Sequence, residues 1–212
     1  MLRPRIIILL LLTLLPATSR QLRAQGEPEG WRFGGWEFVE INHDFGRSPF
    51  FGSFYFEHDN LQYRHFDCWY TRTILGVKLF PWFKTDVAYD FVKESSRQVH
   101  RAIMDVTATL KEGPLKLSLR ERYLHSWIPA ENRQGNELRS RLKAQYAIPH
   151  SRFSPYLAIE VFTWKDWKKT RHYVACDYDI TRWMQLEAYY LYYTHKEHPS
   201  QHILGIGFNF YL

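Results

Sequence analysis

The last eleven residues, from His202 to Leu212, alternate in polarity with a period of two. Leucine, isoleucine and phenylalanine fill most of one set of positions, and the other set is mostly small or polar. Because successive side chains of a β-strand point to opposite faces, this segment has one apolar face. Strands of soluble sandwiches usually have about 5–6 residues, whereas a tilted strand needs roughly 9–11 to cross a bilayer. The segment therefore predicts a membrane-crossing strand, which the rest of the chain can test.

The same alternation recurs through most of the chain. Between Phe83 and Phe91, for example, the odd positions are apolar, aromatic or threonine, and the even positions are charged or alanine. Eleven segments of this kind are recognisable, although the first two alternate imperfectly: residues 36–41, 50–57, 67–79, 83–91, 101–111, 115–123, 138–148, 155–162, 171–180, 184–193 and 202–212.

The connections between these segments alternate in length. Tight turns at 80–82, 112–114, 149–152 and 181–182 alternate with longer polar links that begin at Lys93, Ser126, Trp164 and Thr194. This rhythm is typical of outer-membrane barrels, whose strands are usually even in number. The predicted fold class is all-β: an antiparallel up-and-down transmembrane β-barrel of about 10–12 strands, with short periplasmic turns and longer external loops. We expect twelve strands, with Trp31–Gly35 as the additional one, or else ten.

The N-terminus has the pattern of an export signal. Arg3 and Arg5 precede the apolar run from Ile6 to Leu15, which would span only about 15 Å as a helix, against a hydrocarbon core of about 30 Å. A short apolar run behind positive charge indicates a secretory signal peptide, and Ala24 gives the best cleavage site. We therefore expect residues 1–24 to be a signal peptide and residues 25–212 a single outer-membrane β-barrel domain, in which Gln25–Gly30 is a flexible leader. The expected location is the cell outer membrane.

Removal of this signal changes the charge and leaves two cysteines. The signal holds four of the 28 Lys and Arg residues and no acid, so the mature balance is 24 minus 22, or +2. The mature chain therefore lacks the strong positive charge that would indicate a nucleic-acid partner. Cys68 and Cys176 could form one disulfide in an exported protein. Because the alternation places them on opposite faces of their strands, two free thiols are favoured.

Aromatic residues, 17% of the chain, cluster at both ends of the expected strands. Those at the short-turn end are Phe80, Trp82, Phe83, Tyr146, Tyr178, Trp183 and Phe210, and those at the other end are Tyr123, Trp127, Trp164, Tyr190 and Tyr192. Two belts around an aliphatic band match membrane interfaces, whereas a soluble core would concentrate its rings centrally. A secreted soluble barrel that binds an apolar ligand is the disfavoured alternative.

Charged residues share the opposite face of the segments, which would line the lumen. The expected lumen charge ladder comprises Arg72, Arg101, Arg120, Arg122, Arg139, Arg141, Lys143, Glu160, Arg171, Asp177 and Glu187. Its basic members would form a cationic wall, and the acids Asp86, Asp90, Asp105, Glu160, Asp177 and Glu187 a counter-wall. Gly205 and Gly207 would leave room for the long basic side chains.

This charged lumen has two interpretations. It could be a salt-bridged plug in a structural barrel. Alternatively, it could be a passive narrow channel whose transverse field orients or selects a small anionic solute.

No segment carries a catalytic or metal signature. The ten histidines include no HExxH pair, and His195 and His198, which share one link, are more simply read as solvated. His125–Ser126 and His150–Ser151 are the only neighbours that could serve a lipid hydrolase, but adjacent strand residues point to opposite faces. We expect no cofactor and no enzyme, with an outer-membrane lipid-modifying enzyme as the alternative.

Four stretches carry a likeness to a known family: Leu138-Arg139-Ser140-Arg141-Leu142, the strand from Pro155-Tyr156 to Glu160, the strand that contains Arg171, and Leu204-Gly205-Ile206-Gly207-Phe208. With these the chain resembles the uncharacterised domain-of-unknown-function twenty-four ninety family of small outer-membrane β-barrel proteins. The resemblance covers nearly the whole mature chain and implies a barrel and an outer-membrane location, but no activity. The expected partners are outer-membrane lipid and the barrel insertion machinery, which would read the C-terminal strand, although this strand ends in Leu212 rather than the usual Phe. No feature indicates an oligomeric state.

Overall fold

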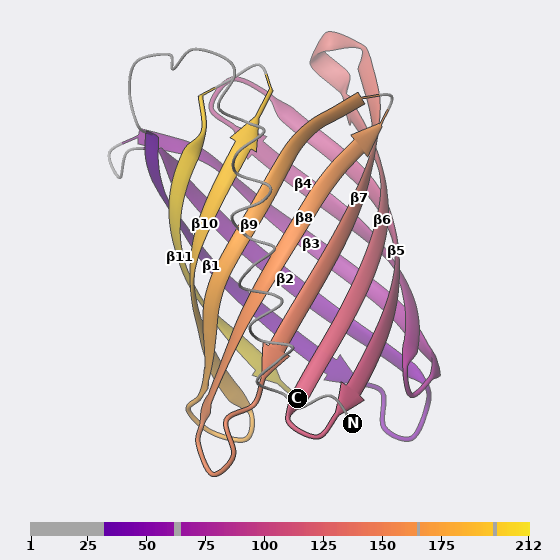
Figure 1. Ribbon diagram of the computed structural model, residues 1–212. Coiled ribbons are helices and arrows are strands. Elements are labelled where there is room, and N and C mark those ends of the chain that lie inside the picture. Colours follow the sequence, from indigo (N-terminus) through magenta and orange to yellow (C-terminus); the bar gives the residue numbers. More distant parts are fainter. Residues whose placement is uncertain (1–31, 62–64, 165, 197–198) are drawn as a thin grey trace. The chain divides into compact units, whose positions relative to one another are not determined.

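The computed structural model describes residues 32–61, 65–164, 166–196 and 199–212. The expected signal peptide, residues 1–24, and the leader Gln25–Gly30 lie outside these residues. The described chain forms strands joined by short links, with one 3-10 turn (Figure 1). The elements are β1 (Arg32–Asp44), β2 (Phe50–Leu61), β3 (His65–Phe80), β4 (Phe83–Glu94), β5 (Gln98–Glu112), β6 (Leu115–Ile128), η1 (Pro129–Glu131), β7 (Arg133–Tyr146), β8 (Phe153–Trp164), β9 (Asp166–Asp179), β10 (Met184–His195) and β11 (Gln201–Tyr211). Within the described residues, no helix is long and apolar enough to cross a membrane.

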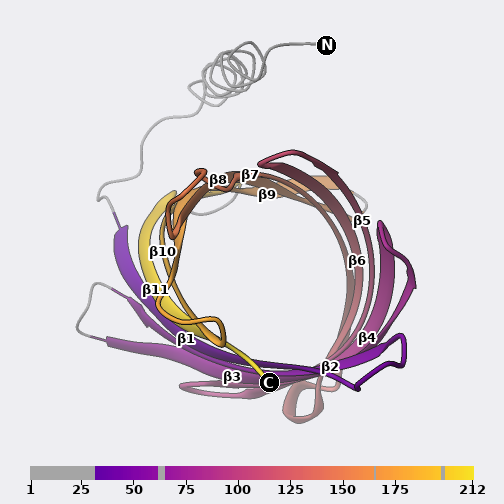
Figure 2. The same ribbon diagram turned by 90° about the horizontal axis from the view of Figure 1, so that it is seen from below.

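The eleven strands close into a barrel (Figure 2). Each strand pairs antiparallel with the next along the chain, and β1 pairs with β11 in parallel, from Arg32 opposite Gln201 to Asn42 opposite Tyr211. The predicted all-β barrel is thereby confirmed. The expectation of twelve strands, or of ten, is wrong, because residues 32–35 run directly into β1 and form no separate strand. An odd number can close because a parallel pair also satisfies the backbone donors and acceptors.

The strands run further than the sequence alternation predicted. Residues 126–136, expected as a long link, are mostly strand and pair up to Ile128 opposite Arg133, on either side of η1. Links 45–49, 81–82, 113–114, 147–152 and 180–183 lie at the rim that carries Leu212, here called the C-terminal rim, and links 95–97 and 129–132 lie at the opposite rim, here called the η1 rim. These fully described links are similar in length at the two rims, so they do not show the expected contrast between short turns and long loops. Backbone pairing does not need an apolar face, and alternation therefore stops marking a strand where both faces become polar.

The two faces of the barrel differ sharply in polarity. Large apolar side chains project outward and stay exposed, as shown by Leu75 at 59%, Val87 at 57% and Leu204 at 57% of their surface. Charged side chains project inward and are buried, as shown by Asp90 at 0% and Glu160 at 2%. This distribution is the reverse of that in a soluble barrel. Cys68 and Cys176 are not joined by a disulfide, as their opposite faces predict, and Cys68 donates a hydrogen bond to Asp59 at 3.3 Å.

Aromatic rings pack on the inner face of β11, where glycines leave space. A Cβ atom added at Gly205 would overlap the ring of Tyr189, and one added at Gly207 would overlap the ring of Phe38. The expectation that these glycines accommodate the cationic wall is therefore wrong, because the neighbouring strands β10 and β1 supply rings instead. Both rings belong to an inward-facing cluster that also contains Tyr173, Leu191 and Ile203.

Candidate functional site

A cavity of about 650 Å³ lies inside the barrel. Its lining begins at the C-terminal rim with Asp44, Lys84 and Leu212, and reaches inward as far as Tyr70 and Arg171. Because Asp44 and Leu212 are exposed, the cavity opens at the C-terminal rim.

Nearer the η1 rim, apolar side chains project into the lumen and narrow it. Phe162, Leu191 and Ile203, here called the constriction, keep only 2%, 0% and 2% of their surface exposed. Arg171 joins this layer, since its guanidinium carbon lies 5.0 Å from the centre of the Phe162 ring. Side chains this buried have no water-sized space beside them. The lining of the cavity does not include these three side chains.

The basic side of the cavity comes from neighbouring strands. Arg120 on β6 is paired in register with Arg141 on β7. The Nη2 atom of Arg120 lies 2.7 Å from Glu160, and Nη1 of Arg171 lies 3.5 Å from the same carboxylate. Glu160 on β8 thus pairs with guanidinium groups from β6 and β9 and offsets their mutual repulsion.

Arg141 differs from its neighbours, because among the described residues no carboxylate forms an ion pair with it. Its guanidinium carbon lies 4.8 Å from the centre of the Tyr173 ring, and its Nε atom is buried without a hydrogen-bond acceptor. Lys84 and Lys116 also line the cavity without an ion pair in the described chain. Positive charge on this side is therefore only partly neutralised by the protein.

The expected lumen charge ladder lies on inward-facing positions of its strands. Its members that line the cavity are Arg72, Arg120, Arg122, Arg139, Arg141, Glu160, Arg171 and Glu187. Arg101, Lys143 and Asp177 are not lining residues: Arg101 lies 3.9 Å from Asp90, and Lys143 lies 3.8 Å from Asp177.

The expected counter-wall is arranged differently from the prediction. Asp90, Asp105 and Glu160 pair with basic residues beside them rather than facing those residues across the lumen. Asp177 likewise lies beside Lys143. Only Glu187 of the expected acids belongs to the wall described next.

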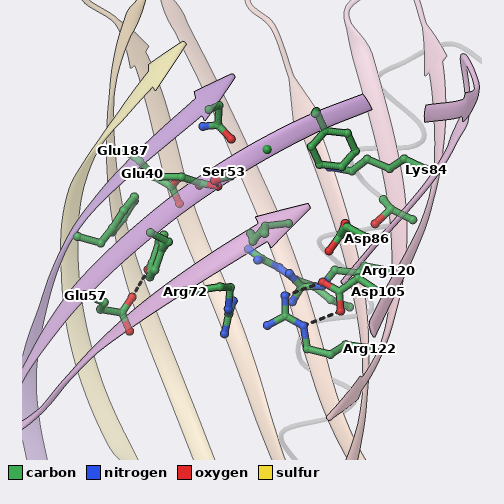
Figure 3. Close-up of a pocket in the computed structure, with 18 of the residues that line it drawn as sticks. Glu40, Ser53, Glu57, Arg72, Lys84, Asp86, Asp105, Arg120, Arg122 and Glu187 are labelled. Carbon is green, nitrogen blue, oxygen red and sulfur yellow. Dashed lines mark hydrogen bonds and ion pairs between the residues drawn. The ribbon is translucent and has the colours of Figure 1, made fainter. Parts of the chain in front are cut away.

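The acidic side of the cavity consists of Glu40 on β1, Glu57 on β2 and Glu187 on β10, here called the acidic wall. Neutral groups hold these carboxylates: Ser53 donates a hydrogen bond of 2.8 Å to Glu40, Tyr55 donates to Glu57, and Tyr156 donates to Glu187. Figure 3 shows the three glutamates on one side of the cavity, with Arg120 and Arg122 on the other. The sequence analysis missed Glu40 and Glu57.

The strand order explains why these walls oppose each other. In the closed ring, β6 is five strands from β1 in one direction, and β7 is five strands from β1 in the other. Glu40 on β1 therefore lies across the barrel from Arg120 and Arg141. Charges of opposite sign on opposite walls create a field across the cavity.

The candidate catalytic neighbours do not meet in the structure. Ser126 donates a hydrogen bond to the carbonyl of Gly135, and His125 contacts the side-chain oxygen of Asn136 at 2.8 Å. Ser151 accepts a hydrogen bond from the backbone N–H of Phe153. Among the described residues, no group of three or more His, Cys, Asp or Glu side chains could hold a metal ion. His198, the partner considered for His195, lies outside them.

Solved structures of porins resemble this barrel. The NanC porin matches with a TM-score of 0.57 and 12% identity, over 86% of this chain and all of that chain, which shows the shared fold. The KdgM porin gives a TM-score of 0.49 at 15% identity, over 73% of this chain and 81% of that one. A structure titled KdgM porin in complex with disordered oligogalacturonate gives the same TM-score at 16% identity, over 74% and 82% of the two chains.

Comparison with curated proteins finds no match to this sequence. A family model described as a protein of unknown function, DUF2490, matches residues 33–202. That range covers most of the chain and includes both walls of the cavity. The protein belongs to the DUF2490 family.

Proposed function

We propose that this protein is a small outer-membrane barrel that forms a narrow, constricted channel for small charged solutes. In this proposal residues 1–24 direct export, and residues 25–212 form one domain inserted into the outer membrane. The observation that carries the proposal is a charged cavity of about 650 Å³ inside a barrel with an apolar outer face.

The outer surface supports the membrane location. Exposed apolar side chains occur on strands all around the ring, including Ile41 on β1, Leu75 on β3, Met104 on β5 and Val174 on β9. Soluble monomers rarely expose contiguous apolar patches larger than a few hundred Å². Closure of the barrel leaves no unpaired strand edge, as a hydrocarbon environment requires.

Aromatic side chains at both rims support the same location. Phe80 and Trp82 stack at the C-terminal rim with ring centres 5.5 Å apart. Toward the η1 rim, His100 stacks on Trp127 at 5.4 Å. Such amphipathic rings are enriched where a membrane meets water.

The lumen supports a channel of low conductance. Solutes would enter the cavity at the C-terminal rim, where Asp44 and Lys84 line the opening. Passage would require the side chains of the constriction to move aside. The NanC-like fold is consistent with such a passage.

A structural barrel without transport is the second candidate, and buried ion pairs favour it. Arg72 pairs with Asp90 at 2.7 Å, and Arg122 pairs with Asp105 at 2.6 Å. Such pairs fill part of the interior with fixed charged side chains.

Recording of single-channel currents in planar lipid bilayers distinguishes these two candidates. We expect small, discrete current steps from refolded protein whose fold is verified by different migration of boiled and unboiled samples on SDS gels. A folded preparation that carries no current would refute the channel and support the structural barrel. Recovery of the protein in the soluble fraction, without detergent, would contradict both.

A further inference from the structure

We infer that the lumen cavity binds solutes that carry both a positive and a negative group, in preference to solutes of one sign. This inference rests on the proposed function, since it names the class of solute for the same cavity. It follows from two walls of opposite charge, each of which keeps charges that the protein itself does not neutralise.

The acidic wall keeps its negative charge unpaired. Glu40, Glu57 and Glu187 form no ion pair within the described chain, although other lumen carboxylates, such as Asp105 and Glu160, do. Their hydrogen bonds come from the hydroxyl groups of Ser53, Tyr55 and Tyr156, which fix the carboxylates without cancelling their charge. A cation from outside is the group that would complete this wall.

The opposite wall keeps positive charge unpaired. Arg141 faces the cavity with no ion-pair partner in the described residues, and its Nε atom has no acceptor. Lys116 and Lys84 line the same cavity on β6 and β4, again without an ion pair there. An anionic group is the complement to this side.

The opposed walls penalise solutes of a single sign. A carboxylate beside Arg141 still experiences repulsion from Glu40 and Glu187 across the cavity, because partly buried charges are screened less by solvent than charges on the surface. If the solute also carries an ammonium group at its other end, Glu40 and Glu187 attract that group, and this attraction outweighs their repulsion of the carboxylate.

The size and lining of the cavity fit a small solute of this kind. Pockets for small molecules have volumes of about 300–1,000 Å³, and this cavity falls within that range. Trp36, Tyr55 and Tyr189 also line it and offer apolar ring surface to the carbon chain between two charged groups.

Three solutes of matched length test the inference: 6-aminohexanoate, hexanoate and hexylammonium. Titration calorimetry on the refolded full chain in detergent measures each binding constant. We expect 6-aminohexanoate to bind about tenfold more tightly than either singly charged solute, which is the effect of roughly one favourable ion pair in a partly buried site. Equal or tighter binding of hexanoate would overturn the inference.

Two substitutions locate the binding groups. Glu40→Gln is expected to weaken the binding of 6-aminohexanoate and to strengthen that of hexanoate, because one attractive and one repulsive charge is lost, so that the two affinities converge. Arg141→Gln should weaken the binding of both carboxylates and strengthen that of hexylammonium. Glu112→Gln, at an exposed position outside the cavity, is the matched control and should change none of the three constants.

The outcome separates this inference from the channel itself. Calorimetry does not require conduction, so selective binding by a barrel that carries no current would refute the channel and keep the inference. Current steps together with tighter binding of hexanoate would refute the inference and keep the channel. Loss of binding in Arg141→Gln counts only if the boiled and unboiled samples still migrate differently.

Discussion

Arg122 donates two hydrogen bonds to the carboxylate of Asp105 inside the barrel, from Nε to Oδ1 at 2.8 Å and from Nη2 to Oδ2 at 2.6 Å. Both side chains are only 5% exposed. Replacement of Arg122 by Gln would leave the Asp105 charge buried without its partner, which typically costs about 3–5 kcal/mol. We expect Arg122→Gln to lower the free energy of unfolding by this amount in urea titrations of protein in lipid vesicles.

An exposed ion pair at the C-terminal rim provides the control. Lys78 contacts Asp44 at 2.7 Å, but the two side chains are 49% and 60% exposed. Solvent screens such a pair, which is worth only about 0–1 kcal/mol. Lys78→Gln should therefore barely change stability, and a loss as large as that of Arg122→Gln would refute the argument from burial.

Substitution of Gly205 tests the ring packing on β11. The added methyl group of Gly205→Ala would overlap the ring of Tyr189, and overpacking of this kind costs about 1–3 kcal/mol. The same measurement on Gly135→Ala should show little change, because the nearest atom there, Oγ of Ser126, would lie at an ordinary contact distance of 3.5 Å. Removal of the ring in Gly205→Ala/Tyr189→Leu should abolish the overlap. If the double variant loses more free energy of unfolding than the two single variants lose together, the packing account is wrong.

The period of two was enough to predict the barrel and its faces, because it reports directly which side of each strand meets an apolar environment. Its eleven segments fall one in each of the eleven strands, and the error in strand number came from the expectation of an even number. The parallel pairing of β1 with β11, which makes an odd number possible, uses backbone groups that the alternation does not report. The links were misjudged for a related reason. Arg133–Asn136 begins β7 outside the apolar band, where both sets of alternate positions are polar or small and the alternation disappears.

Glu40 of the acidic wall escaped prediction because acids occupy both faces of β1. Glu37 projects outward and contacts His58 at 3.0 Å, whereas Glu40 projects inward. With acids on both faces, the pattern of residues 36–41 did not show which face of this segment points into the lumen. Partners within the lumen were also beyond the sequence, because they depend on the register between strands, as in Arg122 opposite Asp105.

The constriction should control the conductance of the channel. Phe162→Ala removes the ring that packs beside Arg139 and Arg171, with guanidinium carbons 4.7 and 5.0 Å from its centre. We expect the single-channel current to rise severalfold, because the narrowest part of the lumen gains a space the size of an aromatic ring. Phe208→Ala, which removes the same ring from the outer face of β11, should leave the current unchanged. Equal currents in all three proteins would place the conduction barrier elsewhere.

Val87 tests whether lipid covers the outer face. It lies near the middle of β4 with 57% of its surface exposed, next to Asp86, which lines the cavity on the opposite face of the strand. In a bilayer, lysine at such a position destabilises a barrel by about 2–4 kcal/mol near the midplane, because its ammonium group loses hydration. We expect Val87→Lys to lower the free energy of unfolding in vesicles by this amount. Ser95→Lys, at an exposed position in the link between β4 and β5, should have little effect. In a soluble barrel both lysines would face water, so an unchanged stability of Val87→Lys would contradict the membrane location.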